Sequence, residues 1–168
     1  LCFDAGPLGY GHVHQDKLNV VVWSGGREVL FDGGGGPYEN SKWRKYDIDT
    51  FSHNTVLVDG LPQRRVFSYS AKENQIAKEP LDARWQSTSA YDFVEGAYEE
   101  GYGKPEARPA RHVRRVLFVK PDIFVVADLL TPLDGKEHEY EARWQLLTTS
   151  TSQQGLLVQT TDKGKPNL

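Results

Sequence analysis

Sulfur-containing residues are nearly absent from the sequence, which has one cysteine, Cys2, and no methionine among its 168 residues. A single cysteine cannot form a disulfide within the chain, so the cysteine content leaves the redox compartment open. The sequence also lacks any apolar run approaching the roughly 20 residues of a membrane-spanning helix. Residues 1–6 lack the charged start and long apolar stretch of a signal peptide, so the chain itself carries no evidence of export.

Positive charge is not concentrated along the chain either. The formal net charge is −3 and the Lys and Arg residues are scattered, which argues against nucleic acid as the main partner. One local cluster is the exception, and it comprises Arg108, Arg111, Arg114 and Arg115. We favour a solvated strand face for this cluster, and a patch facing an anionic polymer is the alternative.

No internal repeat, low-complexity tract or interior linker divides the sequence. Its length and its 38% apolar content suffice for one hydrophobic core, so we predict a single domain over residues 1–168. The missing methionine, and a tail that stops soon after the apolar residues 156–158, favour a fragment truncated at one or both ends.

Helical periodicity is hard to find, whereas short β-branched and aromatic runs separated by Gly, Pro or Asp recur throughout. Residues 19–23 and 28–31 flank Ser24-Gly25-Gly26, which predicts a hairpin turn with positive φ. Residues 115–119 and 123–127 are joined by Lys120-Pro121-Asp122, which predicts a second hairpin.

Further strands are expected at residues 55–58, which run into the turn dipeptide Asp59-Gly60, at residues 83–93 and at residues 140–147. About ten short strands at this spacing predict an all-β fold, an antiparallel β-sandwich.

The run of residues 9–16 carries His12, His14 and Asp16 at alternate positions, which would share one face of an extended segment. Imidazole and carboxylate are common ligands of zinc, and three protein ligands leave one position for water or substrate. That count is met by His14, Asp32 and His53, with Asp16 competing for the role of Asp32. His12 would then remain free for proton chemistry, and structural histidines on strands are the alternative.

A long loop over residues 33–49 begins with four consecutive glycines, residues 33–36. No Gly-Lys-Ser/Thr follows them, so we exclude a phosphate loop, and either a flexible turn or close approach of a ligand explains the glycines. The rest of the loop is rich in aromatic and cationic residues, namely Tyr38, Trp43, Arg44, Lys45 and Tyr46. Together they are typical of a carbohydrate subsite, although any one aromatic side chain could instead cap the sandwich.

Several motifs occur in order along the chain: Asp4-Ala5-Gly6-Pro7-Leu8-Gly9, Gly11-His12-x-His14-x-Asp16-x-Leu18-Asn19, Leu30-Phe31-Asp32-Gly33 and Ser52-His53-Asn54-Thr55. In this respect the chain resembles the β-sheet domain of the heparinase II/III-like polysaccharide lyases, and it is also similar to certain alginate lyases. The resemblance is densest over residues 3–63 and continues more loosely over residues 112–128.

The resemblance implies a larger enzyme in which an N-terminal α/α toroid packs against the sandwich and the substrate cleft lies between them. Such enzymes, exported to the periplasm or cell surface, cleave uronate-containing acidic polysaccharides, heparin-like glycosaminoglycans or alginate, by β-elimination. The implied catalytic residue is His12, and the implied zinc ligands are His14, Asp32 and His53.

Asp16 would support the metal site from its second shell. Asn54 and Arg44 become candidate cleft residues, with a structural role as the equal alternative for Asn54. Tyr38 and Trp43 complete the candidate substrate contacts.

The family's catalytic tyrosine lies on the toroid, which this chain lacks, so the isolated fragment is expected to be inactive. The main rival is a non-catalytic carbohydrate-binding or scaffold sandwich that keeps a structural zinc. A zinc hydrolase is less favoured because no general-base carboxylate can be singled out.

Overall fold

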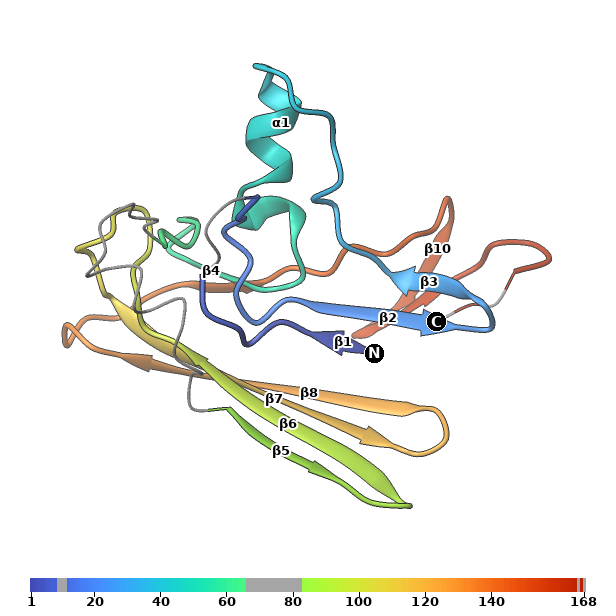
Figure 1. The fold of residues 1–168 in the computed structure, drawn as a ribbon. Coiled ribbons are helices and arrows are strands. Elements are labelled where there is room, and N and C mark those ends of the chain that lie inside the picture. The colour runs from blue at the N-terminus through green and yellow to red at the C-terminus, as the bar shows by residue number, and fades with distance from the viewer. Residues whose placement is uncertain (9–11, 66–82, 166, 168) are drawn as a thin grey trace.

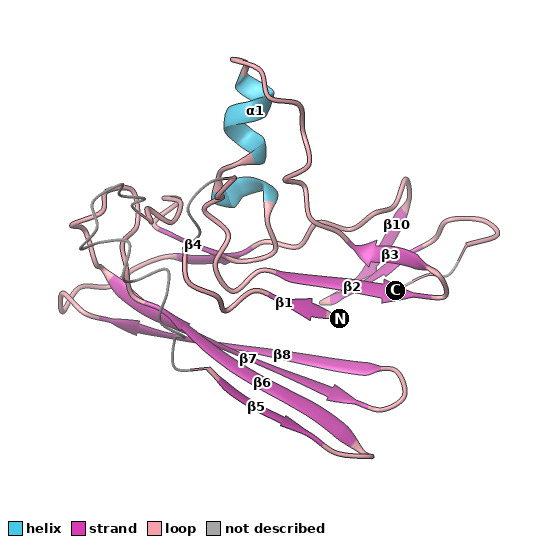
Figure 2. Cartoon of the chain, in the orientation of Figure 1, coloured by secondary structure: helices cyan, strands magenta, loops and turns pink. Residues whose placement is uncertain are grey.

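We describe the protein from a computed structural model, in which residues 1–8, 12–65, 83–165 and 167 are described. Strands dominate these residues (Figure 2). They are β1 (Cys2–Phe3), β2 (Val20–Ser24), β3 (Arg27–Leu30), β4 (Val56–Val58), β5 (Arg84–Ser87), β6 (Tyr91–Tyr98), β7 (Ala110–Val119), β8 (Ile123–Pro132), β9 (Tyr140–Ala142), β10 (Thr151–Gln154) and β11 (Leu157–Thr160). Between β3 and β4 lie a short helix, α1 (Lys42–Asp47), and a 3-10 turn, η1 (Thr50–Ser52).

All strand pairs in the described residues are antiparallel. Strands β5-β6-β7-β8 form a four-stranded sheet and β1-β2-β3 a three-stranded one, while β4-β9 and β10-β11 form two-stranded pairs. The two larger sheets lie one above the other (Figure 1). Val20, Val22 and Val29 of the upper sheet pack with Val116 of β7 in one buried cluster. The prediction of an all-β antiparallel sandwich is therefore confirmed.

Two predicted hairpins are present, whereas the strand predicted over residues 140–147 ends at Ala142 and the one predicted over residues 83–93 is wrong. Gly25 and Gly26 have φ values of 57° and 82° and join β2 to β3, as type I′ geometry requires. Val119 pairs with Ile123 across the turn of the second hairpin. The expected strand over residues 83–93 is instead a hairpin, because the hydroxyl of Thr88 accepts hydrogen bonds from the backbone N–H groups of Ala90 and Tyr91.

The extended conformation expected around His12 is also wrong. His12 has a φ of 58°, in the left-handed region, and residues 12–16 belong to no strand. Alternation along a strand therefore does not place the side chains of this run. Residues 9–11 lie outside the described residues.

Helix α1 lies in the loop where the sequence shows no helical pattern, and it projects from the sandwich (Figure 1). The hydroxyl of Ser41 accepts a hydrogen bond from the backbone N–H of Arg44 and so caps the first turn. None of the described helices has the length and apolar character needed to cross a membrane.

The arginine cluster does not share one environment. Arg111 and Arg115 are exposed and pair with Glu99 and Glu95, as expected for a solvated face. For Arg114 the same prediction is wrong, because its side chain is completely buried.

Candidate functional site

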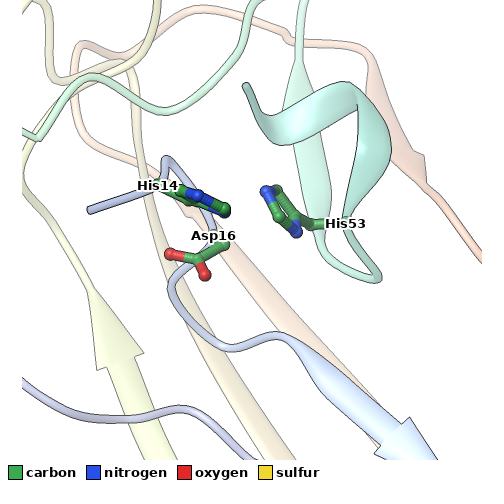
Figure 3. A group of neighbouring side chains, drawn as sticks. All are labelled: His14, Asp16 and His53. Atoms are coloured by element: carbon green, nitrogen blue, oxygen red, sulfur yellow. The ribbon is translucent and has the colours of Figure 1, made fainter. Parts of the chain in front are cut away.

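Three segments meet at one end of the three-stranded sheet: residues 12–16, which precede β2, residues 31–34, which follow β3, and residues 52–54, which begin with the last residue of η1. His14, Asp16 and His53 each offer a ligand atom, and these atoms all lie within 4.8 Å of one another. Figure 3 shows the rings of His14 and His53 facing each other, with the side chain of Asp16 beside them. Two imidazoles and a carboxylate at this spacing form a donor set that suits zinc.

His53 is the most confined member of the group, since its side chain has no exposed surface. Its Nδ1 lies 2.6 Å from Oδ1 of Asp32, while its Nε2 is buried and has no hydrogen-bond partner among the described residues. A buried polar nitrogen without a partner is costly. Carboxylates commonly orient metal-binding imidazoles in this way, so the environment of His53 fits a metal ligand.

Asp32 joins the site through His53. Burial opposes ionisation of Asp32, but hydrogen bonds from His53 and from the backbone N–H of Gly34, at 3.1 Å, outweigh it and hold the pKa of Asp32 below its usual value. Asp32 is therefore an anion at neutral pH, which is the form that binds a cation or orients an imidazole.

The protonation states of the other two donors depend mainly on burial. Burial, and then the neighbouring ring of His53, lowers the pKa of His14 below 6.5. Burial raises the pKa of Asp16 above its usual value. Metal ligation requires neutral imidazole, so His14 is in the correct state at neutral pH without a change in charge.

The glycine run provides room for the two rings rather than unusual backbone angles. A Cβ added to Gly34 would lie 2.5 Å from Nδ1 of His14 and 2.9 Å from Cε1 of His53. A Cβ added to Gly35 would meet no atom within 4 Å. At Gly34 the groups that approach the backbone closely are the chain's own histidine rings, so close approach of a ligand stays a prediction.

His12 lies on the surface, two residues before His14, and contacts Tyr38. The Tyr38 hydroxyl is hydrogen-bonded to Nδ1 of His12, and their rings meet edge to face with centroids 5.4 Å apart. The guanidinium of Arg44 lies 4.5 Å from the centroid of the Tyr38 ring. The contact with Tyr38 occupies one ring nitrogen of His12, and no described residue is hydrogen-bonded to Nε2.

The aromatic residues of the 33–49 loop are exposed. Tyr38 is 73% exposed, Trp43 63% and Tyr46 41%. The ammonium of Lys42 lies 4.9 Å from the Trp43 ring. Aromatic rings that are largely accessible and paired with cations favour a surface for acidic sugars over caps on the core.

Asn54 is completely buried, and its side-chain amide is fully engaged. Nδ2 donates to the carbonyls of Val20 and Phe31, at 2.9 and 2.8 Å, and Oδ1 accepts from the backbone N–H of Gln145. These bonds leave no side-chain atom for a substrate, so they favour the structural alternative for Asn54.

The family model described as "Heparinase II/III-like, C-terminal" matches residues 1–165. The chain belongs to this heparinase II/III-like family. No curated protein matches it. The family match confirms the resemblance drawn from the motifs and supports a polysaccharide lyase role for the full protein.

Several site residues of this heparinase-like domain were within reach of sequence reasoning. Of the three predicted ligands, His14 and His53 lie in one group with Asp16, whereas Asp32 is bonded to Nδ1 of His53 and is not a member of that group. Tyr38 contacts His12, and Arg44 lies over the Tyr38 ring. Sequence reasoning missed the specific role of Gly34, and the four-glycine run was the signal that could have revealed it.

Proposed function

We propose that this domain forms the sandwich wall of the active site of a lyase that cleaves a uronate-containing polysaccharide, heparin-like or alginate-like, by β-elimination. An N-terminal α/α toroid of the same protein would form the opposite wall. The observation that carries the proposal is the exposed His12, two residues before His14 of the donor group formed by His14, Asp16 and the buried His53, in a chain of the heparinase II/III-like family.

Zinc would be held by His14 and His53 together with a carboxylate, which is either Asp16, the member of their group, or Asp32, the ligand expected from the sequence, which here bonds Nδ1 of His53. Support for this comes from the unpaired Nε2 of His53 and from the carboxylate on its Nδ1. When bound, the ion would supply a fixed link between the segments that carry these side chains, and so a rigid wall.

His12 would move the proton. In the tautomer in which Nδ1–H donates to the Tyr38 hydroxyl oxygen, Nε2 carries no proton and can accept the C5 proton of the uronate. The electrons of the C5–H bond then form the C4–C5 double bond as the C4–O bond breaks, and the departing oxygen takes up a proton from the opposite wall. A histidine positioned in this way typically contributes about 10²- to 10⁴-fold to the rate.

The exposed loop and helix α1 would bind the sugar chain. Tyr38 and Trp43 present accessible ring surfaces for pyranose rings, and Arg44 supplies a cation that can pair with the uronate carboxylate. Neutralising that carboxylate lowers the energy of the carbanion-like transition state, because negative charge develops next to it.

The proposal is tested with the complete gene product and a panel of heparin, heparan sulfate and alginate, by recording the ultraviolet absorbance of the new double bond. We expect product with at least one polymer, no product from His12→Ala, and retention of zinc by that variant. His138→Ala, at a histidine outside the site that bonds Asp59 and Asp134, should retain activity. Normal product formation by His12→Ala would remove His12 from the mechanism, and binding of the polymers without any product would favour the non-catalytic carbohydrate-binding sandwich.

We also propose that the protein acts in the periplasm or at the cell surface, where extracellular polysaccharide is accessible. Fractionation of cells that express the complete gene tests this location, and recovery of the protein in the cytoplasmic fraction would contradict it.

A further inference from the structure

Asn54 connects separate segments of the chain within the core. Besides the three bonds of its side chain, its backbone N–H donates to Oδ1 of Asn19 at 2.9 Å. The two carbonyls that accept from its side chain belong to Val20, the first residue of β2, and to Phe31, the residue directly after β3. One buried residue therefore fixes several backbone segments relative to one another.

These segments are the ones that carry the metal-binding side chains. Asn54 directly follows His53, and Phe31 directly precedes Asp32. Asn19 and Val20 close the segment that carries His14 and Asp16. The hydrogen bonds of Asn54 therefore lie within a few residues of each metal-binding side chain. Loss of the Asn54 side-chain amide would release the backbone close to those side chains.

Arg114 holds the same arrangement from the opposite sheet. Its guanidinium is completely buried, and Nη1 donates to the carbonyls of Leu18, at 2.8 Å, and Asn54. The Nε and Nη2 atoms of Arg114 contact both carboxylate oxygens of Asp128, at 2.7 and 2.9 Å. Strands β7 and β8 thus anchor a cation that joins the histidine segment before β2 to the histidine segment before β4.

We propose that Asn54 and Arg114 are positioning residues of the metal site: they hold the segments of His14, Asp32 and His53 at the separation that a metal ion requires. The inference rests on the metal site of the proposed function. Donor groups bind a metal tightly only when their own backbone is held in place, and residues that orient the ligands typically change metal affinity by about 10- to 100-fold.

The test is the dissociation constant of Zn²⁺ alone, measured by chelator competition on the complete gene product. Asn54→Ser removes both amide donors, and Arg114→Lys keeps the charge but cannot reach two carbonyls and both Asp128 oxygens at once. We expect each variant to bind Zn²⁺ about 10- to 100-fold more weakly. The visible spectrum of the Co²⁺-loaded variants should also change, since it reports the geometry of the ligands.

Tyr98→Phe is the matched control for a purely structural effect. The Tyr98 hydroxyl is buried and bonds three backbone groups, the N–H of Arg64 and both the N–H and the carbonyl of Gly101, none of them in a donor segment. This variant should lose thermal stability and keep the wild-type Zn²⁺ affinity and Co²⁺ spectrum.

The outcomes separate the two claims. Wild-type affinity in a folded Asn54→Ser variant, or in Arg114→Lys if the first variant does not fold, overturns the positioning role while the metal site stands. A wild-type protein that binds no Zn²⁺ overturns the metal site and the positioning role together. Equal weakening by Tyr98→Phe would show a general loss of stability and would also overturn the inference.

Discussion

Two histidines of this protein have nearly the same immediate chemistry. The side chains of His53 and His112 are both completely buried, and each bonds an aspartate oxygen, Asp32 at 2.6 Å and Asp128 at 2.7 Å. Each also has one buried ring nitrogen without a hydrogen-bond partner in the described residues, Nε2 of His53 and Nδ1 of His112.

The surroundings of the two pairs differ, and this difference is why we propose a metal site at His53 and a structural role for His112. Asp128 is already neutralised by Arg114, which contacts both of its oxygens, and no metal-binding group of described residues includes His112. Among the described residues, Asp32 is bonded only by His53 and a backbone N–H of Gly34, and the ring of His14 lies 5.3 Å from that of His53. A histidine–aspartate pair therefore indicates a metal site only when further donors converge on it and its charge is not yet balanced.

The largest expected difference between the pairs is in stability without metal. Asp128→Ala leaves the buried Arg114 unpaired and should lower the free energy of unfolding by about 3–5 kcal/mol. Asp32→Ala removes a carboxylate that is 38% exposed, and should cost only about 1 kcal/mol. Denaturant unfolding in the presence of a chelator measures both, and equal losses would contradict the distinction.

The next difference is in metal binding. His53→Gln removes a proposed ligand and should weaken Zn²⁺ binding by more than roughly 100-fold, beyond the effect of an orienting residue. His112→Gln should leave Zn²⁺ affinity close to wild type, because Arg114 keeps its two bonds to Asp128. Chelator competition gives both values, and loss of affinity only in the His112 variant would reverse the assignment.

The features of the fold that could be predicted from the sequence are those with local causes. The turn at Gly25-Gly26 was predictable because positive φ at both residues demands glycine. The turn after Thr88 was missed because a side-chain hydroxyl, rather than glycine or proline, stabilises it. Helix α1 was missed because it has only six residues, although Ser41 could have indicated its start.

The site was predictable in its residue types but not in its construction. The histidines and carboxylates were evident from their motifs, and the family resemblance supplied their roles. The burial of Arg114 could not be predicted, because its partners Leu18 and Asn54 are 96 and 60 residues away. Such long-range pairings have no signature in local composition or periodicity.

A smaller effect on Zn²⁺ affinity is expected from a substitution at Gly34, whose backbone lies against the rings of His14 and His53. Gly34→Ala forces a methyl group against the rings of His14 and His53, so Zn²⁺ affinity should fall by about 10-fold, at the low end for residues that orient ligands. Gly35→Ala, where no atom lies within 4 Å, is the matched control. Equal affinities for the two variants would show that the rings can move away without loss.

The smallest expected effect is on the pH dependence of stability, and it involves a third histidine. His138 bonds a carboxylate at each ring nitrogen, Asp134 and Asp59, and these bonds raise its pKa above 6.5. Its contribution to stability is therefore complete below pH 6.5 and is lost as the pH rises through the raised pKa. Burial lowers the pKa of His112, so its contribution is present above pH 6.5 and is lost as the pH falls.

Unfolding of His138→Gln and His112→Gln across pH 5–9 checks these opposite trends. The deficit of His138→Gln relative to wild type should shrink with rising pH, and that of His112→Gln should shrink with falling pH. Parallel pH profiles for the two variants would contradict the assigned charge states.

The most direct test of the difference between the two histidine pairs is elemental analysis of the purified, unchelated protein. The account predicts about one zinc per chain, as expected for a single set of three protein ligands, and loss of that zinc in His53→Gln but not in His112→Gln. Protein without metal that does not refill when zinc is added would contradict the account.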